Sequence, residues 1–240
     1  MPGPSPGMTT RFGGDRILIW LPKVLDAETL VRVREFVTGA EFRDGKPTAG
    51  NLGRAVKANE ELDRATPAKA AIDALVTAAL ERNPMFEAAA RPKKFTQPIY
   101  SRYRPGMQYG RHMDNPTMGR GDERLRIDLS ITLFLSEPES YEGGELTVET
   151  EYGPREAKLP AGDAIVYPTI YYHEVKPVTK GERLAAVMWI QSLIKEPFQR
   201  ALLYELSTVA DWLHRQHPDS APDKQLVKVQ MNLLRMWAEN

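Results

Sequence analysis

Two of the four histidines have neighbours whose type and spacing suit a metal ion. His112 and Asp114 stand two residues apart in the segment RHMDNP, which we interpret as a strand or its end. Residues i and i+2 of a strand share one face, so both side chains can reach one ion. His173, on a distant segment read as a strand, is the candidate third ligand. Two histidines and one carboxylate leave about three positions open on octahedral iron, which is what oxygen activation requires.

The other two histidines, His214 and His217, lie in the segment HRQHPDS and are interpreted as exposed residues at a helix end. The chain has no cysteine, which excludes disulfides, thiolate metal sites and a cysteine nucleophile. Because a lone His-x-Asp pair is a common coincidence at protein surfaces, the metal assignment depends on the residues around it.

An arginine ten residues past the third candidate ligand gives the first such support. In the segment ERLAAVMWIQ, alternation places Arg183 and Trp189 on one face. If that face lines a cavity, the guanidinium needs an anion to offset its desolvation. A dicarboxylate with one end on the metal would pair with Arg183 through two hydrogen bonds. The alternative is an arginine at a sheet edge, paired with Glu174 or Glu182.

The segment RIDLSITLFLS alternates as well. One face is apolar, and the other carries Asp128, Ser130, Thr132 and Phe134. This pattern fits a barrel strand that faces a polar ligand inside and packs against helices outside, whereas an ordinary half-exposed sheet is the alternative.

Two tyrosines precede the first candidate ligand. Tyr103 and Tyr109 stand nine and three residues before His112. Their hydroxyls could hydrogen-bond a cosubstrate or order the metal ligands, and packing in the core is the alternative for both.

The elements that would position these residues lie in the middle of the chain. Between residues 95 and 195, short strand-like segments alternate with turns that contain glycine or proline, which is typical of a β-barrel or sandwich. Before them we expect a strand at 16–21, a helix capped by Asp26, and a loop at 43–62 that could cover the site. A second helix, capped by Thr66 and with Pro67 as its first residue, is expected to run to about Arg82. After them, helices at 197–214 and 223–238 are expected to pack on the barrel, or also to form a dimer surface.

Composition limits the partners. The 240 residues suit one domain with a helical extension. Thirty-two basic residues balance thirty-two acidic ones, so neither nucleic acid nor an anionic membrane is an expected partner. No apolar run approaches the ~18 residues that span a bilayer, and the start of the chain has no signal peptide, which favours the cytoplasm. The expected divisions are a disordered leader at 1–15, a support region at 16–94, the core at 95–195 and a helical extension at 196–240.

The combined motifs resemble a known family. The chain carries Tyr103-x-x-Gly106-x-x-Tyr109-x-x-His112-x-Asp114, then GGEL, AGD, His173 and Arg183. This series resembles the prolyl 4-hydroxylase type of 2-oxoglutarate oxygenase, and more closely the bacterial PKHD-type hydroxylases, sometimes described as iron-uptake factors. The resemblance spans most of residues 16–215.

The resemblance implies a double-stranded β-helix, or jelly-roll, core with flanking helices. It implies Fe(II) at His112, Asp114 and His173. It further implies 2-oxoglutarate anchored by Arg183, L-ascorbate as reductant, and homodimers formed through the C-terminal helices. Tyr103 and Thr132 are further candidate contacts of the cosubstrate, although Thr132 stands near a position where the family pattern has an aliphatic residue. Phe134 departs from the pattern, because a tyrosine that assists the cosubstrate carboxylate is expected there.

The reaction so implied is hydroxylation of an unactivated C–H bond, coupled to oxidative decarboxylation of 2-oxoglutarate to succinate. A siderophore-related small molecule is the first candidate substrate and a prolyl residue the second. Two alternatives stay open: a non-catalytic jelly roll that binds metal or ligand, and a nucleic-acid demethylase of the same superfamily. Against the demethylase, the arginines between 102 and 126 are interleaved with acidic residues.

Overall fold

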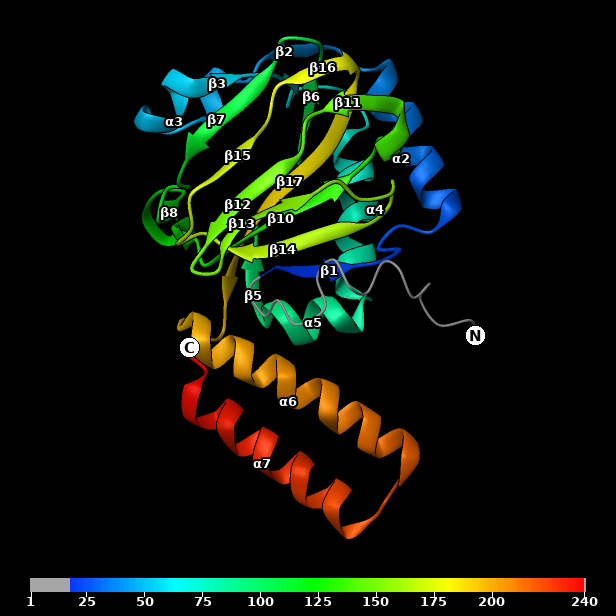
Figure 1. The fold of residues 1–240 in the computed structure, drawn as a ribbon, viewed down its shortest axis with the longest axis vertical. Helices are drawn as coiled ribbons and strands as arrows, with labels where there is room; N and C mark the ends of the chain where they lie inside the picture. Colours follow the sequence, from blue (N-terminus) through cyan, green and yellow to red (C-terminus); the bar gives the residue numbers. More distant parts are fainter. Residues whose placement is uncertain (1–17, 240) are drawn as a thin grey trace.

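The computed structural model describes residues 18–239, so the leader expected at 1–15 lies outside the described residues. Two antiparallel β-sheets face one another and helices cover one outer face (Figure 1). This is the jelly-roll core with flanking helices that the sequence predicted.

The larger sheet is the platform of the molecule. Its strands run in the spatial order β1 (Ile19–Leu21), β14 (Ala164–Pro168), β10 (Leu129–Phe134), β17 (Arg183–Ser192), β6 (Ile99–Tyr103), β4 (Glu60–Leu62) and β2 (Phe42–Asp44), and β5 (Pro92–Phe95) also pairs with β17.

The smaller sheet lies opposite. Its strands run in the order β13 (Gly153–Ala157), β12 (Leu146–Thr150), β15 (His173–Val175), β7 (Gln108–His112) and β3 (Lys57–Ala58). Two further pairs join β11 (Tyr141–Gly143) to β16 (Val178–Gly181), and β8 (Thr117–Met118) to β9 (Leu125–Arg126).

Alternation along the central strand separates two cores. Ile131 and Leu133 of β10 face the helices and join one buried cluster, whereas Phe134 faces the other sheet and joins a second. The predicted division of this strand into an apolar and a more polar face is therefore confirmed, since Ser130 and Thr132 line a cavity between the sheets.

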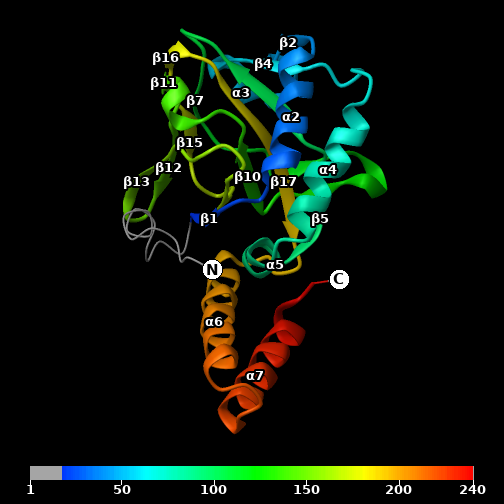
Figure 2. The same ribbon diagram turned by 90° about the vertical axis from the view of Figure 1, so that its right-hand side faces the viewer.

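Three helices cover the outer face of the larger sheet: α2 (Ala27–Gly39), α4 (Lys69–Glu81) and α5 (Pro84–Ala90) (Figure 2). The Asp26 carboxylate caps α2 by accepting a hydrogen bond from the Thr29 backbone N–H at 2.8 Å, as predicted. The predicted cap at Thr66 and start at Pro67 are wrong, because α4 begins at Lys69, after Ala68 takes a left-handed conformation with φ of 64°.

The segment 43–62 is not the loop that its composition predicted. It contains part of β2, a 3₁₀ turn (Lys46–Thr48), the short helix α3 (Asn51–Val56), β3 and β4. The chain pairs first with β7 of the smaller sheet and then with β6 of the larger one, so it bridges the two sheets. Long-range pairing therefore overrides the local preference of its Gly, Pro and Asn residues.

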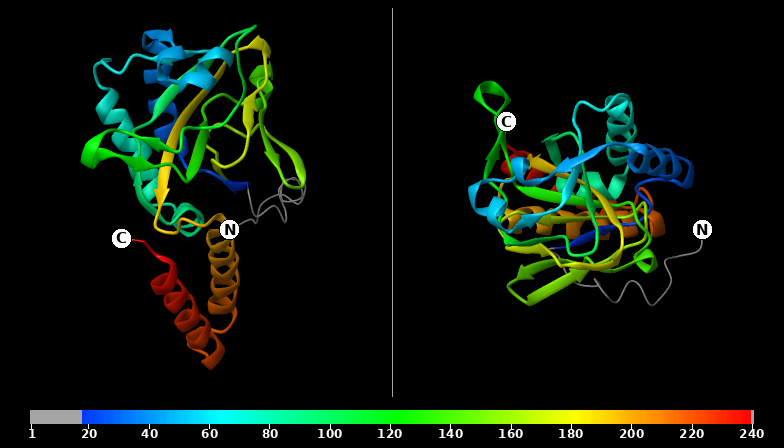
Figure 3. Two further views of the ribbon diagram at one scale, coloured as in Figure 1. Left: turned by 90° about the vertical axis from the view of Figure 1, so that its left-hand side faces the viewer. Right: turned by 90° about the horizontal axis from the view of Figure 1, so that it is seen from above.

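The C-terminal helices form a hairpin, α6 (Pro197–Gln216) and α7 (Ala221–Trp237), that projects away from the sheets (Figures 1 and 3). The prediction that both helices pack on the barrel is wrong for most of their length. Leu203 of α6 is fully buried, where this helix meets α5. The far end of the chain is tied back by Glu239, whose backbone N–H donates to Leu193 and whose carboxylate accepts from Arg126. No described helix is both long and apolar enough to cross a bilayer.

Candidate active site

Strand pairing brings the three predicted metal ligands together. His112, at the end of β7, is the register partner of His173, at the start of β15, and their ring centroids lie 4.3 Å apart. Asp114 follows β7, and its Oδ2 lies 3.7 Å from Nε2 of His173. One ligand atom from each of the three residues can be chosen so that all lie within 4.8 Å of one another. The three side chains can therefore meet at one ion.

Backbone carbonyls orient both imidazoles. Nδ1 of His112 lies 2.8 Å from the Gly110 carbonyl oxygen, and Nδ1 of His173 lies 3.2 Å from that of Tyr171. A carbonyl oxygen only accepts, so Nδ1 donates in each ring and Nε2 is the nitrogen left to bind a metal. This is the arrangement in which histidine binds a metal through Nε2.

Burial keeps His112 neutral. Desolvation, the charge of His173 and the charge of Lys57 lower its pKa to about 3, against an opposing hydrogen bond to Gly110. The ring is therefore uncharged at neutral pH, which is the form that binds a metal.

The donor set fits ferrous iron. Oδ2 of Asp114 is buried and, within residues 18–239, has no hydrogen-bond partner. A buried carboxylate oxygen without a partner is costly unless a cation completes it. Two imidazole nitrogens and one carboxylate on one side of a cavity match the facial triad of non-haem Fe(II) oxygenases.

Arg183 lies in the same cavity. It is only 1% exposed, and its Nε and Nη2 atoms have no acceptor among the residues that the structure describes. The rings of Tyr103 and Phe134 lie 5.2 and 5.4 Å from its Cζ. The alternative of an edge arginine paired with an acidic residue is therefore wrong. Unpaired donors on a buried cation indicate a place for an anion.

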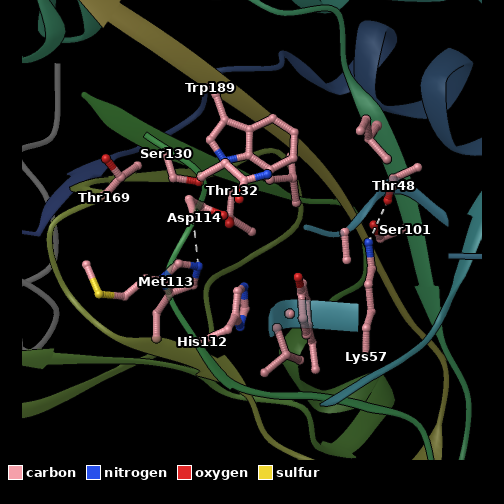
Figure 4. Close-up of a pocket in the computed structure, with 18 of the residues that line it drawn as sticks. Thr48, Lys57, Ser101, His112, Met113, Asp114, Ser130, Thr132, Thr169 and Trp189 are labelled. Carbon is pink, nitrogen blue, oxygen red and sulfur yellow. Dashed lines mark hydrogen bonds and ion pairs between the residues drawn. The ribbon is translucent and has the colours of Figure 1, made fainter. Parts of the chain in front are cut away.

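The cavity holds about 580 Å³, and Trp189 is among the residues that line it (Figure 4). Thr132 lines it from β10, and Tyr103 lines it from β6, as the register partner of Arg183. Burial raises the pKa of Tyr103 to about 12, so its hydroxyl keeps its proton and can donate a hydrogen bond. The assignment of Tyr103 and Thr132 to the cosubstrate stays a prediction.

Sequence reasoning missed three buried polar residues in the wall of the cavity. Lys57 of β3, Glu61 of β4 and Asn59 between these strands all line it. The Lys57 ammonium donates to the Glu61 carboxylate and, at 2.8 Å, to the Thr48 hydroxyl (Figure 4). Their alternate spacing was a possible signal, but the surrounding Gly, Pro and Asn residues favoured a loop.

Fold and site together define a member of the 2OG-Fe(II) oxygenase superfamily, whose family model matches residues 98–191. A second model, the PKHD-type hydroxylase C-terminal domain, matches residues 198–239. A PKHD-type hydroxylase from Thioalkalivibrio sulfidiphilus is 46% identical over 93% of this chain and all of its own length. One from Paraburkholderia phytofirmans is 42% identical with the same coverage. The chain belongs to the PKHD-type hydroxylases, and it is an oxygenase of the Fe(II)- and 2-oxoglutarate-dependent class.

Solved structures share the fold at low sequence identity. A prolyl hydroxylase from Trichoplax adhaerens, in complex with a hypoxia inducible factor peptide fragment, gives a TM-score of 0.54 at 17% identity, over 82% of this chain and 91% of that chain. A 2OG-Fe(II) oxygenase family protein from Burkholderia pseudomallei gives 0.53 at 18%, over 79% and 90%.

Proposed function

We propose that this protein hydroxylates an unactivated C–H bond of a small molecule, with decarboxylation of 2-oxoglutarate to succinate. The observation that carries the proposal is the meeting of His112, Asp114 and His173 in one buried cavity with Arg183, whose Nε and Nη2 have no acceptor within residues 18–239. A metal-binding jelly roll without catalysis would give no reason to bury a cation with free donors in the same cavity as the metal ligands.

Each residue has a role that its position supports. His112, Asp114 and His173 would hold Fe(II), which when bound supplies open positions for a keto acid and for oxygen. Arg183 would pair with the far carboxylate of 2-oxoglutarate and so fix its orientation. Tyr103, beside Arg183, would donate a hydrogen bond to the same carboxylate, and Thr132 would contact the cosubstrate from β10. Phe134 cannot replace the tyrosine expected at its position, since it has no hydroxyl.

The shape of the site favours a substrate larger than one side chain. A neighbouring cavity of about 1080 Å³ shares Thr48, Asn115 and Trp189 with the first. Its walls include the ion pairs Arg43–Asp63 and Lys69–Asp73, which would suit a ligand with several polar groups. We therefore place a polar small molecule, such as a siderophore-related compound, before a prolyl residue.

The reaction is tested by succinate formation with Fe(II), ascorbate as reductant, 2-oxoglutarate and fractionated cell metabolites. We expect certain fractions to stimulate the wild-type protein, and His112→Gln to remove that stimulation because the triad loses a ligand. His217→Gln, which changes a histidine outside the cavity, is the matched control. Stimulation that survives His112→Gln would contradict the proposal.

Further expectations belong to the same proposal. Ascorbate would keep the iron ferrous, and the location would be the cytoplasm. Neither nucleic acid nor a membrane would be a partner, in agreement with the balanced charge. The protein would form a homodimer through α6 and α7, whose exposed apolar side chains include Trp212 and Met236. The chain would divide into a support region, a core and a helical extension, with boundaries at 94/95 and 195/196.

A further inference from the structure

One aromatic residue of the cavity has a contact that its place in the sequence does not predict. Tyr109 and His112 stand three residues apart in β7, and alternation along a regular strand would send them to opposite faces. Their rings are nevertheless stacked, with centroids 3.6 Å apart and planes at 13°. The stack therefore needs a local irregularity in the strand.

A β-bulge in β7 supplies it. His173 pairs with His112 and Val175 with Tyr109, so two steps along β15 correspond to three steps along β7. The extra residue turns one side chain to the other face, which is how bulges next to active sites re-aim side chains. The bulge thus places Tyr109 directly against a candidate metal ligand.

Segment 43–62, which bridges the two sheets, packs against Tyr109. A Cβ atom added at Gly53 of α3 would lie 2.5 Å from the Tyr109 hydroxyl oxygen, and one added at Gly110 would lie 3.0 Å from Cβ of Val56. Both glycines therefore permit an approach that a larger residue would block. The Lys57 ammonium, fixed by Glu61, adds a cation 5.0 Å from the centre of the tyrosine ring.

The contact completes the orientation of the imidazole. The hydrogen bond from Nδ1 of His112 to the Gly110 carbonyl fixes one atom of the ring, but the ring can still tilt about that bond. A flat partner at van der Waals distance removes the tilt. Carbonyl and tyrosine together therefore determine where Nε2 points.

We propose that Tyr109 is a positioning residue, which sets the plane of His112 for metal binding through its ring face rather than its hydroxyl. This inference rests on the proposed function, because it takes the triad to be the metal site. Tyr109 would thus act on metal affinity without touching the metal, and Gly53 would act through Tyr109.

The experiment measures the affinity of the metal-free protein for Mn(II), an inert stand-in for Fe(II), by electron paramagnetic resonance. Tyr109→Phe keeps the ring and should bind Mn(II) as the wild type does. Tyr109→Leu removes the flat partner and should weaken binding about tenfold, as is usual for residues that orient a ligand. The spectrum of bound Mn(II) should broaden in the leucine variant alone.

A double variant separates positioning from general packing. Gly53→Ala should push the tyrosine off the imidazole and weaken Mn(II) binding. Gly53→Ala combined with Tyr109→Phe should restore binding, because the atom that the new Cβ meets is gone. Gly39→Ala is the matched control, since a Cβ at that helical glycine meets nothing within 4 Å.

The outcomes are distinguishable. A wild-type protein that binds no Mn(II) would overturn the proposed function itself. Binding by the wild type, with equal affinities in the phenylalanine and leucine variants, would overturn the role of Tyr109. Failure of the double variant to recover would overturn the action of Gly53 through the tyrosine. Should Gly53→Ala alone not fold, the two variants at position 109 still decide.

Discussion

The buried guanidinium of Arg183 is the most informative single group at the residue scale. An ionised side chain removed from water without a partner destabilises the folded protein, and a bound dicarboxylate removes that penalty. Under the proposed function, Arg183 would thus link the stability of the protein to the binding of 2-oxoglutarate.

Replacing Arg183 separates its effect on the stability of the protein from its effect on 2-oxoglutarate binding. Arg183→Met should raise the melting temperature of the protein without cosubstrate, because an unpaired buried charge is lost. It should also weaken 2-oxoglutarate binding roughly 10- to 100-fold, since hydrogen bonds to charged groups contribute about 1.5–3 kcal/mol. Thermal melts with and without 2-oxoglutarate measure both. Arg104→Met, at a half-exposed arginine outside the cavity, is the control. Equal stabilisation of Arg183→Met and wild type by 2-oxoglutarate would refute the assignment.

The sequence alone predicted that some of these residues would meet in one cavity, but it did not predict the contact made by Tyr109. His112 and Asp114 share a face by simple alternation, and the spacing of Arg183 from His173 pointed to the same cavity. The contact of Tyr109 with His112 could not be predicted from the sequence, because a bulge in β7 changes which side chains share a face of the strand. Bulges arise from pairing with a distant strand, which leaves no local trace in the chain.

At the scale of elements, long-range pairing also hid β3 and β4, the two strands through which segment 43–62 bridges the sheets. Lys57 pairs with Tyr109 and Glu61 with Ser101, contacts about forty to fifty residues away along the chain. Local composition indicated a loop there, while strong periodicity predicted the strands of the core and both C-terminal helices correctly. Periodicity predicted that α6 and α7 form, but it did not predict where they pack, since both project away from the barrel.

A pH-sensitive ion pair joins the end of α6 to the start of α7. Nδ1 of His214 lies 3.0 Å from Oδ2 of Asp223. The hydrogen bond to Asp223 raises the pKa of His214, and the hydrogen bond from His214 lowers the pKa of Asp223. Because the pKa of His214 is raised in the folded protein, its ion pair stabilises the fold fully below the ordinary histidine pKa. That stabilisation is lost as the pH rises through the raised pKa of His214. Because the pKa of Asp223 is lowered, its stabilisation is present above the ordinary aspartate pKa and is lost as the pH falls through the lowered pKa of Asp223.

The hairpin should therefore be most stable between the ordinary pKa values of aspartate and histidine, roughly pH 4 to 6.5. Trp212 lies near the turn between α6 and α7, so its fluorescence during thermal melts at a series of pH values measures the effect. His214→Gln should flatten the decline on the alkaline side, while His217→Gln should leave it in place. A wild-type profile that does not fall above neutral pH would contradict this account of the turn.

At the scale of the whole molecule, the hairpin leaves several large apolar side chains exposed. Phe198, Val209, Trp212 and Met236 are each more than half exposed on it. Apolar surface of this kind usually marks an interface. The projection of α6 and α7 from the core makes them accessible to a second copy (Figure 2).

Light scattering coupled to size-exclusion chromatography tests the proposed homodimer. We expect the mass of a dimer for the wild type, and a shift to monomer for Trp212→Glu, because a charge would be buried at the interface. Tyr152→Glu, which alters an exposed aromatic residue on the β12–β13 turn, should leave the dimer intact. A monomeric wild type at all concentrations would show that the hairpin has another purpose.

The central claim is that one Fe(II) and one 2-oxoglutarate share the cavity, held by the triad and by Arg183. Anaerobic addition of both to the protein should produce a visible charge-transfer absorption, which arises only when the keto acid chelates the bound metal. The account predicts this absorption in the wild type, its loss in Asp114→Ala, and in Arg183→Met its appearance only at much higher 2-oxoglutarate. An absorption of unchanged strength in Asp114→Ala would contradict it.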